Sequence, residues 1–206
     1  MANQNDLTGP IPPLSALPKL QTLELGFNSL SGPIPSLVDL GALQDLSLMG
    51  NQLTGQIPDL SGLPNLVGLF IGANALSGPI PDLSKLSKLE WFEAYGNALT
   101  GNIPSLSALP HLHKFEVSHN QLSGEIPYIA NLSELCYFWV DHNSMVGGIP
   151  RPVARPENMG WWSRPIRKAV PERINHGAKR QRPSRLRTTV WADITTLMRL
   201  IELGER

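Results

Sequence analysis

Large aromatic and acidic residues recur at a spacing of 23 residues through the middle of the chain. Aromatic rings among carboxylates suit sugars, which stack on a ring while their hydroxyl groups bond to the acids. They equally suit a peptide that carries Arg or Lys, through cation–π contact and charge pairing. A third interpretation is that the rings only reinforce packing between neighbouring strands. The candidate ligand-binding residues are Phe70, Trp91, Glu93, Tyr95, Glu116, Tyr137, Trp139 and Asp141.

Other residues that can do chemistry are few. His119 and His142 are also 23 residues apart, with Asp141 beside the second, and stacked units would place their side chains about 5 Å apart. The third ligand of such a metal site is hypothetical, so we expect no metal and no other cofactor. The sequence has no Ser/His/Asp grouping, phosphate-binding loop or Cys-x-x-Cys motif. We therefore expect no enzymatic activity.

Charge is distributed unevenly along the chain. The 17 basic and 17 acidic residues give a net charge of zero, which favours neither a nucleic-acid partner nor a membrane partner. Residues 1–150 hold 4 basic and 12 acidic residues, whereas residues 151–206 hold 13 basic and 5 acidic residues. This split predicts two segments of different character that join near residue 150.

The sequence carries few signals of a compartment. Cys136 is the only cysteine, so no intrachain disulfide can form. No apolar run reaches the length of about 18 residues that a membrane-spanning helix needs, and we expect no membrane segment. The first residues lack the basic and apolar regions of a signal peptide. The sequence therefore assigns no localisation.

The elements that position the candidate residues are copies of one unit. Asparagine recurs every 23 residues, and each copy is followed by a phrase such as Asn-Ser-Leu-Ser-Gly-Pro-Ile-Pro at 28–35. A ladder of leucines precedes it, for example Leu17, Leu20, Leu23 and Leu25. The spacing of Leu23 and Leu25 is that of a strand with one buried face. One unit cannot bury these leucines alone, whereas stacked units with parallel strands form one continuous core.

This pattern, LxxLxxLxLxxN followed by xL(S/T)GxIP, resembles the leucine-rich repeat family in its plant-type subclass, which includes receptor-like proteins and polygalacturonase inhibitors. The resemblance implies an α/β-type repeat solenoid: a short right-handed arc with a parallel sheet on the concave face and a mostly irregular or extended convex side. We expect the solenoid over residues 1–150, as seven 23-residue units of which the last is incomplete. Because neither end shows a capping module, the chain resembles a fragment of a longer protein.

The recurring asparagine has a structural role in this interpretation. A tight buried turn leaves backbone donors and acceptors that a leucine cannot satisfy, whereas an amide side chain can bond to both kinds. We therefore expect a hydrogen-bonded ladder, without ligand contacts, at Asn28, Asn51, Asn74, Asn97, Asn120 and Asn143.

The sequence after Pro150 does not continue the pattern. Residues 151–187 are rich in Arg and Pro and poor in aliphatic residues, so we expect a linker or tail that is largely disordered. Residues 188–204 have the apolar spacing of a short helix. The abrupt change favours a shifted reading frame or a gene-model error over a genuine tail such as a nucleic-acid-binding arm.

The expected concave face predicts the function. Strand residues between the buried leucines face solvent there, and repeat solenoids commonly bind on that surface. We expect non-enzymatic recognition of a protein or peptide, as in the typically extracellular ectodomains of the resembled family. One alternative is a polysaccharide-directed or enzyme-inhibiting binder similar to polygalacturonase inhibitors, under which the partner includes a glycan. Another is a structural or ice-interacting surface formed by the Ser/Thr column at 8, 31, 54, 77, 100 and 123.

Overall fold

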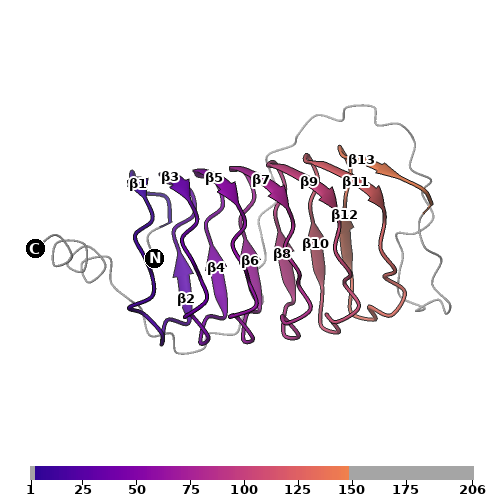
Figure 1. The fold of residues 1–206 in the computed structure, drawn as a ribbon, viewed down its shortest axis with the longest axis horizontal. Coiled ribbons are helices and arrows are strands. Elements are labelled where there is room, and N and C mark those ends of the chain that lie inside the picture. Colours follow the sequence, from indigo (N-terminus) through magenta and orange to yellow (C-terminus); the bar gives the residue numbers. More distant parts are fainter. Residues whose placement is uncertain (1–2, 149–206) are drawn as a thin grey trace, which may run out of the picture.

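The structure is a computed structural model that describes residues 3–148 of the 206-residue chain. Its coils lie side by side along the longest axis of the molecule (Figure 1). Within this range the chain forms strands and turns without any helix, and so without one that is long and apolar enough to cross a bilayer. The predictions for 151–187 and 188–204 concern residues outside the described range.

Each unit makes one coil that contains two extended segments. In the first segment Leu46 and Leu48 are both 1% exposed, as expected of a strand that buries every second residue. In the second segment Gly55 has a φ of 78°, a left-handed conformation that residues with a Cβ rarely adopt. Pro58 follows buried Ile57 and keeps the backbone extended as it leaves this segment.

The first segments form a six-stranded parallel sheet. Neighbouring units pair without offset, so that Leu46 stands opposite Leu23 on one side and opposite Leu69 on the other. Because the units are equally long, residues 23 positions apart become neighbours, and equivalent positions form straight rows. The strands are β2 (Thr22–Glu24), β4 (Asp45–Ser47), β6 (Gly68–Phe70), β8 (Trp91–Glu93), β10 (Lys114–Glu116) and β12 (Tyr137–Trp139).

The return segments form a second parallel sheet, of seven strands, which the sequence did not predict. The expected extended convex side is confirmed, but its segments also pair: Gly32 stands opposite Leu53, and Gly55 opposite Leu76. Extended segments that repeat at equal intervals offer their N–H and C=O groups to the next unit, which satisfies both. The strands are β1 (Thr8–Pro10), β3 (Ser29–Pro33), β5 (Gln52–Gln56), β7 (Ala75–Pro79), β9 (Ala98–Asn102), β11 (Gln121–Glu125) and β13 (Ser144–Val146).

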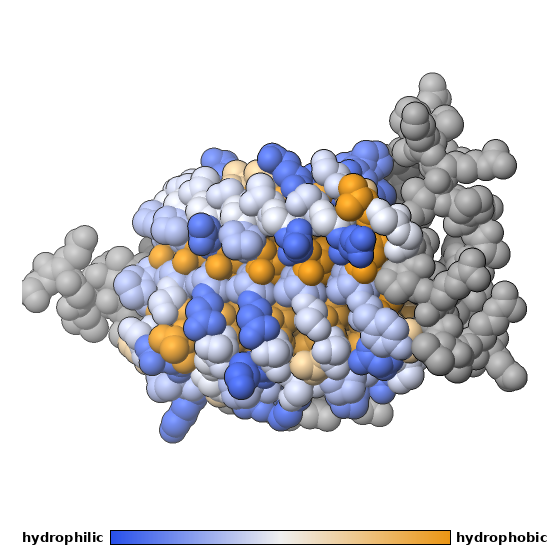
Figure 2. Space-filling view, turned by 45° about the vertical axis from the view of Figure 1, so that its right-hand side comes forward, coloured by the Kyte–Doolittle hydropathy of each residue, from blue (hydrophilic) through white to orange (hydrophobic). Residues whose placement is uncertain are grey.

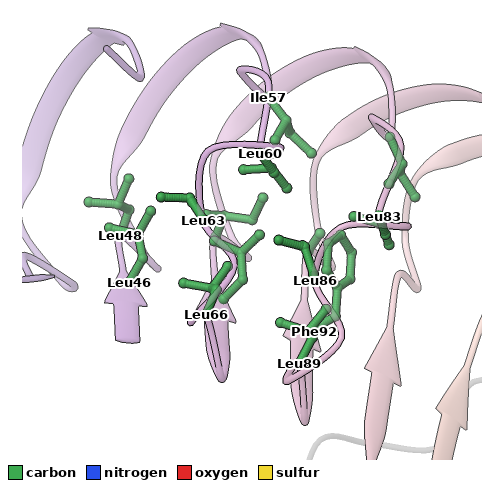
Figure 3. Close-up of a cluster of buried hydrophobic side chains, with 14 of the residues drawn as sticks. Leu46, Leu48, Ile57, Leu60, Leu63, Leu66, Leu83, Leu86, Leu89 and Phe92 are labelled. Carbon is green, nitrogen blue, oxygen red and sulfur yellow. The ribbon is translucent and has the colours of Figure 1, made fainter. Parts of the chain in front are cut away.

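Leucines from every unit fill the space that the coils enclose. Leu60, Leu63 and Leu66 have no exposed surface. Figure 3 shows these side chains pointing inward beside the equivalent leucines of the next unit. Three units place a phenylalanine at the strand position, and the rings of Phe92, Phe115 and Phe138 stack with successive centroids 5.1 Å and 5.7 Å apart. The core is therefore continuous from unit to unit, as the repeat predicts.

The asparagine after each first strand bonds to two units at once. Asn74 Nδ2 donates to the carbonyl oxygens of Ile71 and Gly72 in its own turn and of Leu48 in the preceding unit, at 3.0–3.2 Å. Its Oδ1 accepts from the N–H of Leu53 at 3.0 Å. The side chain thus satisfies backbone groups that the turn leaves unpaired. The same set of contacts is made by Asn51, Asn97, Asn120 and Asn143.

Candidate ligand-binding face

The outward side chains of the six-stranded sheet, together with those of the turn that follows each strand, form four rows that we call the six-stranded face. Figure 2 shows the side of the return segments instead, where equivalent positions likewise form lines of polar and apolar side chains along the stack. All eight candidate residues lie in the four rows of the six-stranded face. The first row is Thr22, Asp45, Gly68, Trp91, Lys114 and Tyr137; the second is Glu24, Ser47, Phe70, Glu93, Glu116 and Trp139; the third is Gly26, Met49, Gly72, Tyr95, Ser118 and Asp141; the fourth is Phe27, Gly50, Ala73, Gly96, His119 and His142.

Three charged side chains of β8 and β10 form a compact cluster on this face. Lys114 Nζ lies 2.9 Å from Glu93 Oε1 and 2.7 Å from Glu116 Oε2. The side chains of Lys114, Glu93 and Glu116 are only 14%, 8% and 11% exposed. The sequence placed both glutamates at solvent-facing positions; they stand in those rows but are buried, because Lys114 lies between them.

Burial and pairing shift the protonation of this cluster. Desolvation raises the pKa of Glu116 above its ordinary value, although the hydrogen bond and charge of Lys114 oppose the shift. Burial alone would lower the pKa of Lys114, but the bonds to Glu116 and Glu93 outweigh it and raise this pKa. Lys114 is therefore held as an ammonium group, and the cluster carries one excess negative charge when both glutamates are ionised.

Two exposed aromatic side chains stand beside the charged cluster. Tyr137 and Trp139 are 47% and 46% exposed, and their rings meet edge to face with centroids 6.0 Å apart. Lys114 Nζ lies 4.8 Å from the centroid of the Trp139 ring, which is within cation–π distance. The same ammonium group thus pairs with both glutamates and contacts a ring, and the ring keeps about half of its surface exposed for another partner.

The rings of two central aromatic residues lie against glycines of the face. A Cβ at Gly68 would stand 2.6 Å from Phe70 Cε2, and one at Gly72 would stand 2.7 Å from the ring of Tyr95. A side chain at either position would have to displace the ring that now occupies this space. The Tyr95 hydroxyl donates to Met49 Sδ at 3.5 Å. Both rings are half-buried in the middle of the face.

The start of the strands adds a carboxylate and a further ring. Burial raises the pKa of Asp45, and the neighbouring charges of Glu24 and Glu90 raise it further. Trp91, in the same row as Asp45, is half-buried, and its ring centroid lies 6.0 Å from that of His113. Asp45 is thus a partly buried carboxylate at this margin of the face, with the charges of Glu24 and Glu90 near it.

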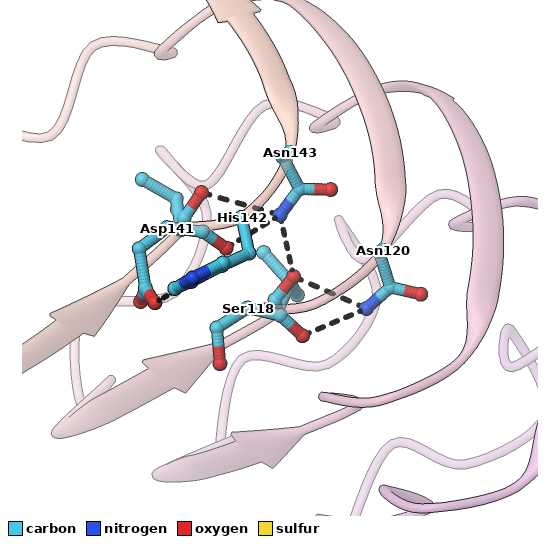
Figure 4. Close-up of polar contacts among 7 residues, drawn as sticks. Ser118, Asn120, Asp141, His142 and Asn143 are labelled. Atoms are coloured by element: carbon cyan, nitrogen blue, oxygen red, sulfur yellow. Dashed lines mark hydrogen bonds and ion pairs between the residues drawn. The ribbon is translucent and has the colours of Figure 1, made fainter. Parts of the chain in front are cut away.

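The last candidate residue, Asp141, belongs to a second polar group at the opposite margin. Asp141 Oδ2 lies 2.6 Å from His142 Nδ1, and the rings of His119 and His142 stack with centroids 4.0 Å apart. Figure 4 shows the side chains of Asp141 and His142 meeting beside the turns that Asn120 and Asn143 hold. The structure thus brings together three groups whose contact the sequence left hypothetical.

Lys114 is the residue of this face that the sequence candidates omitted. It is the one lysine in the four rows. It stands two residues before Glu116 on β10, and it contacts Glu93 of the neighbouring strand β8. A single lysine among several carboxylates could have predicted an ion-paired cluster, because lysine side chains are almost never buried unless they are paired.

Comparisons with known proteins agree with this geometry. Residues 19–39 match the family model described as Leucine Rich Repeat, and the curated proteins gave no match. Among solved structures, the ectodomain of the plant membrane receptor kinase GASSHO1/SCHENGEN3 from Arabidopsis thaliana, in complex with CASPARIAN STRIP INTEGRITY FACTOR 2, is 39% identical with a TM-score of 0.71. That match covers 73% of this chain and 19% of the receptor chain.

Two further solved structures are similar. The plant peptide hormone receptor RGFR1, in complex with RGF2, is 41% identical with a TM-score of 0.70, over 71% of this chain and 24% of that chain. The BIR2 ectodomain from Arabidopsis thaliana is 38% identical with a TM-score of 0.53, over 61% of this chain and 68% of that chain. This chain therefore spans about a fifth to a quarter of the length of the first two receptors. The chain belongs to the leucine-rich repeat family, of the type found in plant receptor ectodomains.

Proposed function

We propose that the six-stranded face binds a peptide, or an extended segment of a protein, that carries lysine or arginine. The observation that carries this proposal is the charge of the face. Its rows hold no arginine and one lysine, Lys114, which already pairs with the two neighbouring glutamates. Opposite charge across an interface speeds encounter and selects partners. The carboxylates of the rows are Glu24, Asp45, Glu93, Glu116 and Asp141.

Exposed aromatic residues supply the second requirement of such a site. Tyrosine and tryptophan carry much of the binding energy of protein interfaces, because a large rigid ring buries apolar surface at little entropic cost. Tyr137 and Trp139 stand half-exposed next to the acidic cluster. A lysine or arginine of a ligand can therefore stack on a ring while its charge lies near a carboxylate.

The dimensions of the face suit a short extended peptide. Six parallel strands about 4.8 Å apart span about 24 Å across the strand direction. An extended peptide advances about 3.3 Å per residue, so about seven ligand residues can cross all six strands. Phe70 and Tyr95 offer half-buried apolar rings in the middle of this path.

Similar solved structures support a peptide ligand. The RGFR1 structure is described as a plant peptide hormone receptor in complex with RGF2, and the GASSHO1/SCHENGEN3 ectodomain was solved in complex with CASPARIAN STRIP INTEGRITY FACTOR 2. Recognition of a peptide without catalysis by this chain agrees with both.

The charge requirement is tested with the full chain and libraries of fluorescent ten-residue peptides. We expect peptides rich in Lys or Arg to bind and their Glu-substituted counterparts not to bind. Added salt should weaken the binding, because exposed charges are screened over about 10 Å at 0.1 M ionic strength. Equal binding of acidic and basic peptides would contradict the proposal. Saturable binding of neutral oligosaccharides on a glycan array, without binding of basic peptides, would favour the glycan alternative instead.

The location of the site is tested with two tyrosines of similar exposure. Tyr137 on the six-stranded face is 47% exposed, and Tyr128, outside the four rows, is 52% exposed. Tyr137→Ala should weaken the binding of the best basic peptide by about tenfold or more, as loss of an interface anchor does. Tyr128→Ala should leave the affinity unchanged. An equal loss in both variants would show that the ligand binds elsewhere or that both variants are misfolded.

A further inference from the structure

We propose that His119, Asp141 and His142 form a binding site for a zinc ion or a similar divalent transition ion at the margin of the six-stranded face. This site goes beyond peptide recognition and revises the expectation that the chain holds no metal. One ligand atom from each of the three residues lies within 4.8 Å of the others. Among the residues from 3 to 148, this is the one group of three or more potential ligands close enough to share an ion.

The distances require only small side-chain movements to reach metal-binding geometry. Two ligand atoms bound to a tetrahedral zinc ion at about 2.0–2.1 Å lie about 3.3 Å from one another. The present separations are at most 4.8 Å, and the three side chains are exposed. Rotation about their side-chain bonds can therefore close the gap without moving the backbone.

The donor set selects the class of ion. Two imidazoles and one carboxylate are the ligands of zinc sites that keep a fourth position open for water. Imidazole nitrogens favour zinc, copper and nickel, whereas calcium and magnesium take sets of oxygen ligands. The group at His119, Asp141 and His142 therefore fits a transition ion and does not fit calcium or magnesium.

The backbone holds the three residues in place before any ion binds. The N–H of His119 donates to the carbonyl oxygen of Asp141 at 3.0 Å, and the N–H of Asn120 donates to that of His142 at 3.2 Å. Asn143 Nδ2 adds a bond to the carbonyl oxygen of Asp141 at 3.3 Å (Figure 4). Two adjacent turns are thus tied together at the ligand positions, so little entropy is lost when an ion binds.

Matching backbone conformations aim the two imidazoles in the same direction. His119 and His142 have φ values of 54° and 52°, and histidine is among the residues that tolerate this left-handed region. Their rings are therefore nearly parallel, with planes 15° apart. Asp141 Oδ2 lies 2.6 Å from His142 Nδ1, so the third ligand already stands beside the second ring.

The chain offers a control group of the same composition. His111 and His113 both approach one carboxylate, Glu134, with their Nδ1 atoms 3.3 Å and 3.9 Å from its oxygens. Removal of either histidine pair deletes two imidazoles from the protein. A general attraction of zinc to exposed histidines would therefore weaken equally in both double variants.

The test is a titration of the full chain with Zn²⁺ by calorimetry in a buffer that does not bind metal. The variants are His119→Asn/His142→Asn and the control His111→Asn/His113→Asn, because asparagine also tolerates the left-handed backbone. We expect the wild type to bind one ion saturably. The first variant should lose at least about tenfold in affinity, a loss that even an outer-shell change causes at metal sites. The control should retain the wild-type affinity.

Three outcomes would overturn the proposal: no saturable binding by the wild type, an equal loss in both double variants, or no loss in either. Circular dichroism of each variant shows whether it is folded. If the first variant fails to fold, NMR of the wild type decides, because Cu²⁺ should broaden the imidazole signals of His119 and His142 before those of His111 and His113. Broadening in the reverse order would also overturn the site.

Discussion

The two sheets share one repeat and one core, but their outward side chains differ in kind. Each row of the six-stranded face changes chemistry from unit to unit; the first row, for example, passes from threonine through aspartate, glycine, tryptophan and lysine to tyrosine. On the seven-stranded sheet, Ser or Thr recurs at 8, 31, 54, 77, 100 and 123, and each is followed by a glycine with φ between 76° and 83°. A residue type that recurs in every unit is compatible with a structural role that every unit needs. A position whose residue type changes from unit to unit has no such shared structural role. This contrast supports recognition through the six-stranded face.

The largest expected effect concerns the core that both sheets share. Leu69→Ala should lower the free energy of unfolding by about 2–5 kcal/mol, because Leu69 is 1% exposed and the stacked units leave no other group to fill the cavity. Val38→Ala, at a position 54% exposed, should change it by less than about 0.5 kcal/mol. Urea unfolding followed by far-UV circular dichroism measures both. Equal midpoints would show that the assignment of inward and outward positions is wrong.

The next effect compares an asparagine of the ladder with the one asparagine in the strands of the other sheet. Asn74→Ala should cost about 1–3 kcal/mol, because the Leu53 N–H and three carbonyl groups lose their partner. Asn102→Ala changes an exposed residue of the seven-stranded sheet and should cost less than about 0.5 kcal/mol. Thermal unfolding compares the two variants. Similar losses would mean that the ladder contributes no more than an ordinary surface residue.

A smaller effect distinguishes two aspartates by the sign of their pH dependence. The pKa of Asp45 on the six-stranded face is raised, chiefly by burial and then by Glu24 and Glu90. The ionised form therefore costs stability above the folded pKa, and this cost disappears as the pH falls below the ordinary value of 3.8. Asp45→Asn should stabilise the protein at neutral pH by less than about 1 kcal/mol, because the group is only partly buried. The gain should vanish near pH 3.

Asp59 should show the opposite sign. Hydrogen bonds from the backbone and side chain of Ser61 lower the pKa of Asp59. Its ionised form therefore contributes stability above the ordinary value, and this contribution is lost as the pH falls through the folded pKa. Asp59→Asn should accordingly destabilise the protein at neutral pH. Urea unfolding at several pH values compares both variants with the wild type, and slopes of the same sign would contradict this assignment.

The smallest expected effect concerns the repeated hydroxyl row. Thr54→Ala combined with Ser77→Ala should change the free energy of unfolding by less than about 0.5 kcal/mol for each residue, because Thr54 is exposed and Ser77 is only half-buried. The affinity for basic peptides should be unchanged. Weaker peptide binding in this double variant would show that recognition extends to the seven-stranded sheet, and would remove the contrast between the two faces.

The sequence alone predicted the solenoid and the order of its rows. Units of equal length that bury alternate leucines have one way to stack that covers every leucine, so residues such as Leu46 and Leu69 must become neighbours. The same argument places Phe70, Glu93 and Trp139 in one row. The extended convex side was also predictable, because proline restricts both its own backbone and that of the preceding residue.

Contacts between side chains of different units were beyond the sequence. The period assigned Glu93 and Glu116 to solvent, but Lys114 buries them, because exposure depends on which side chain stands in the neighbouring unit and how it is oriented. The second sheet likewise arises from hydrogen bonds between units. The meeting of Asp141 and His142 depends on a left-handed turn. The repeat thus determined which residues stand in each row, whereas the tertiary structure decided which of them touch, because side-chain burial and pairing depend on local neighbours that do not repeat.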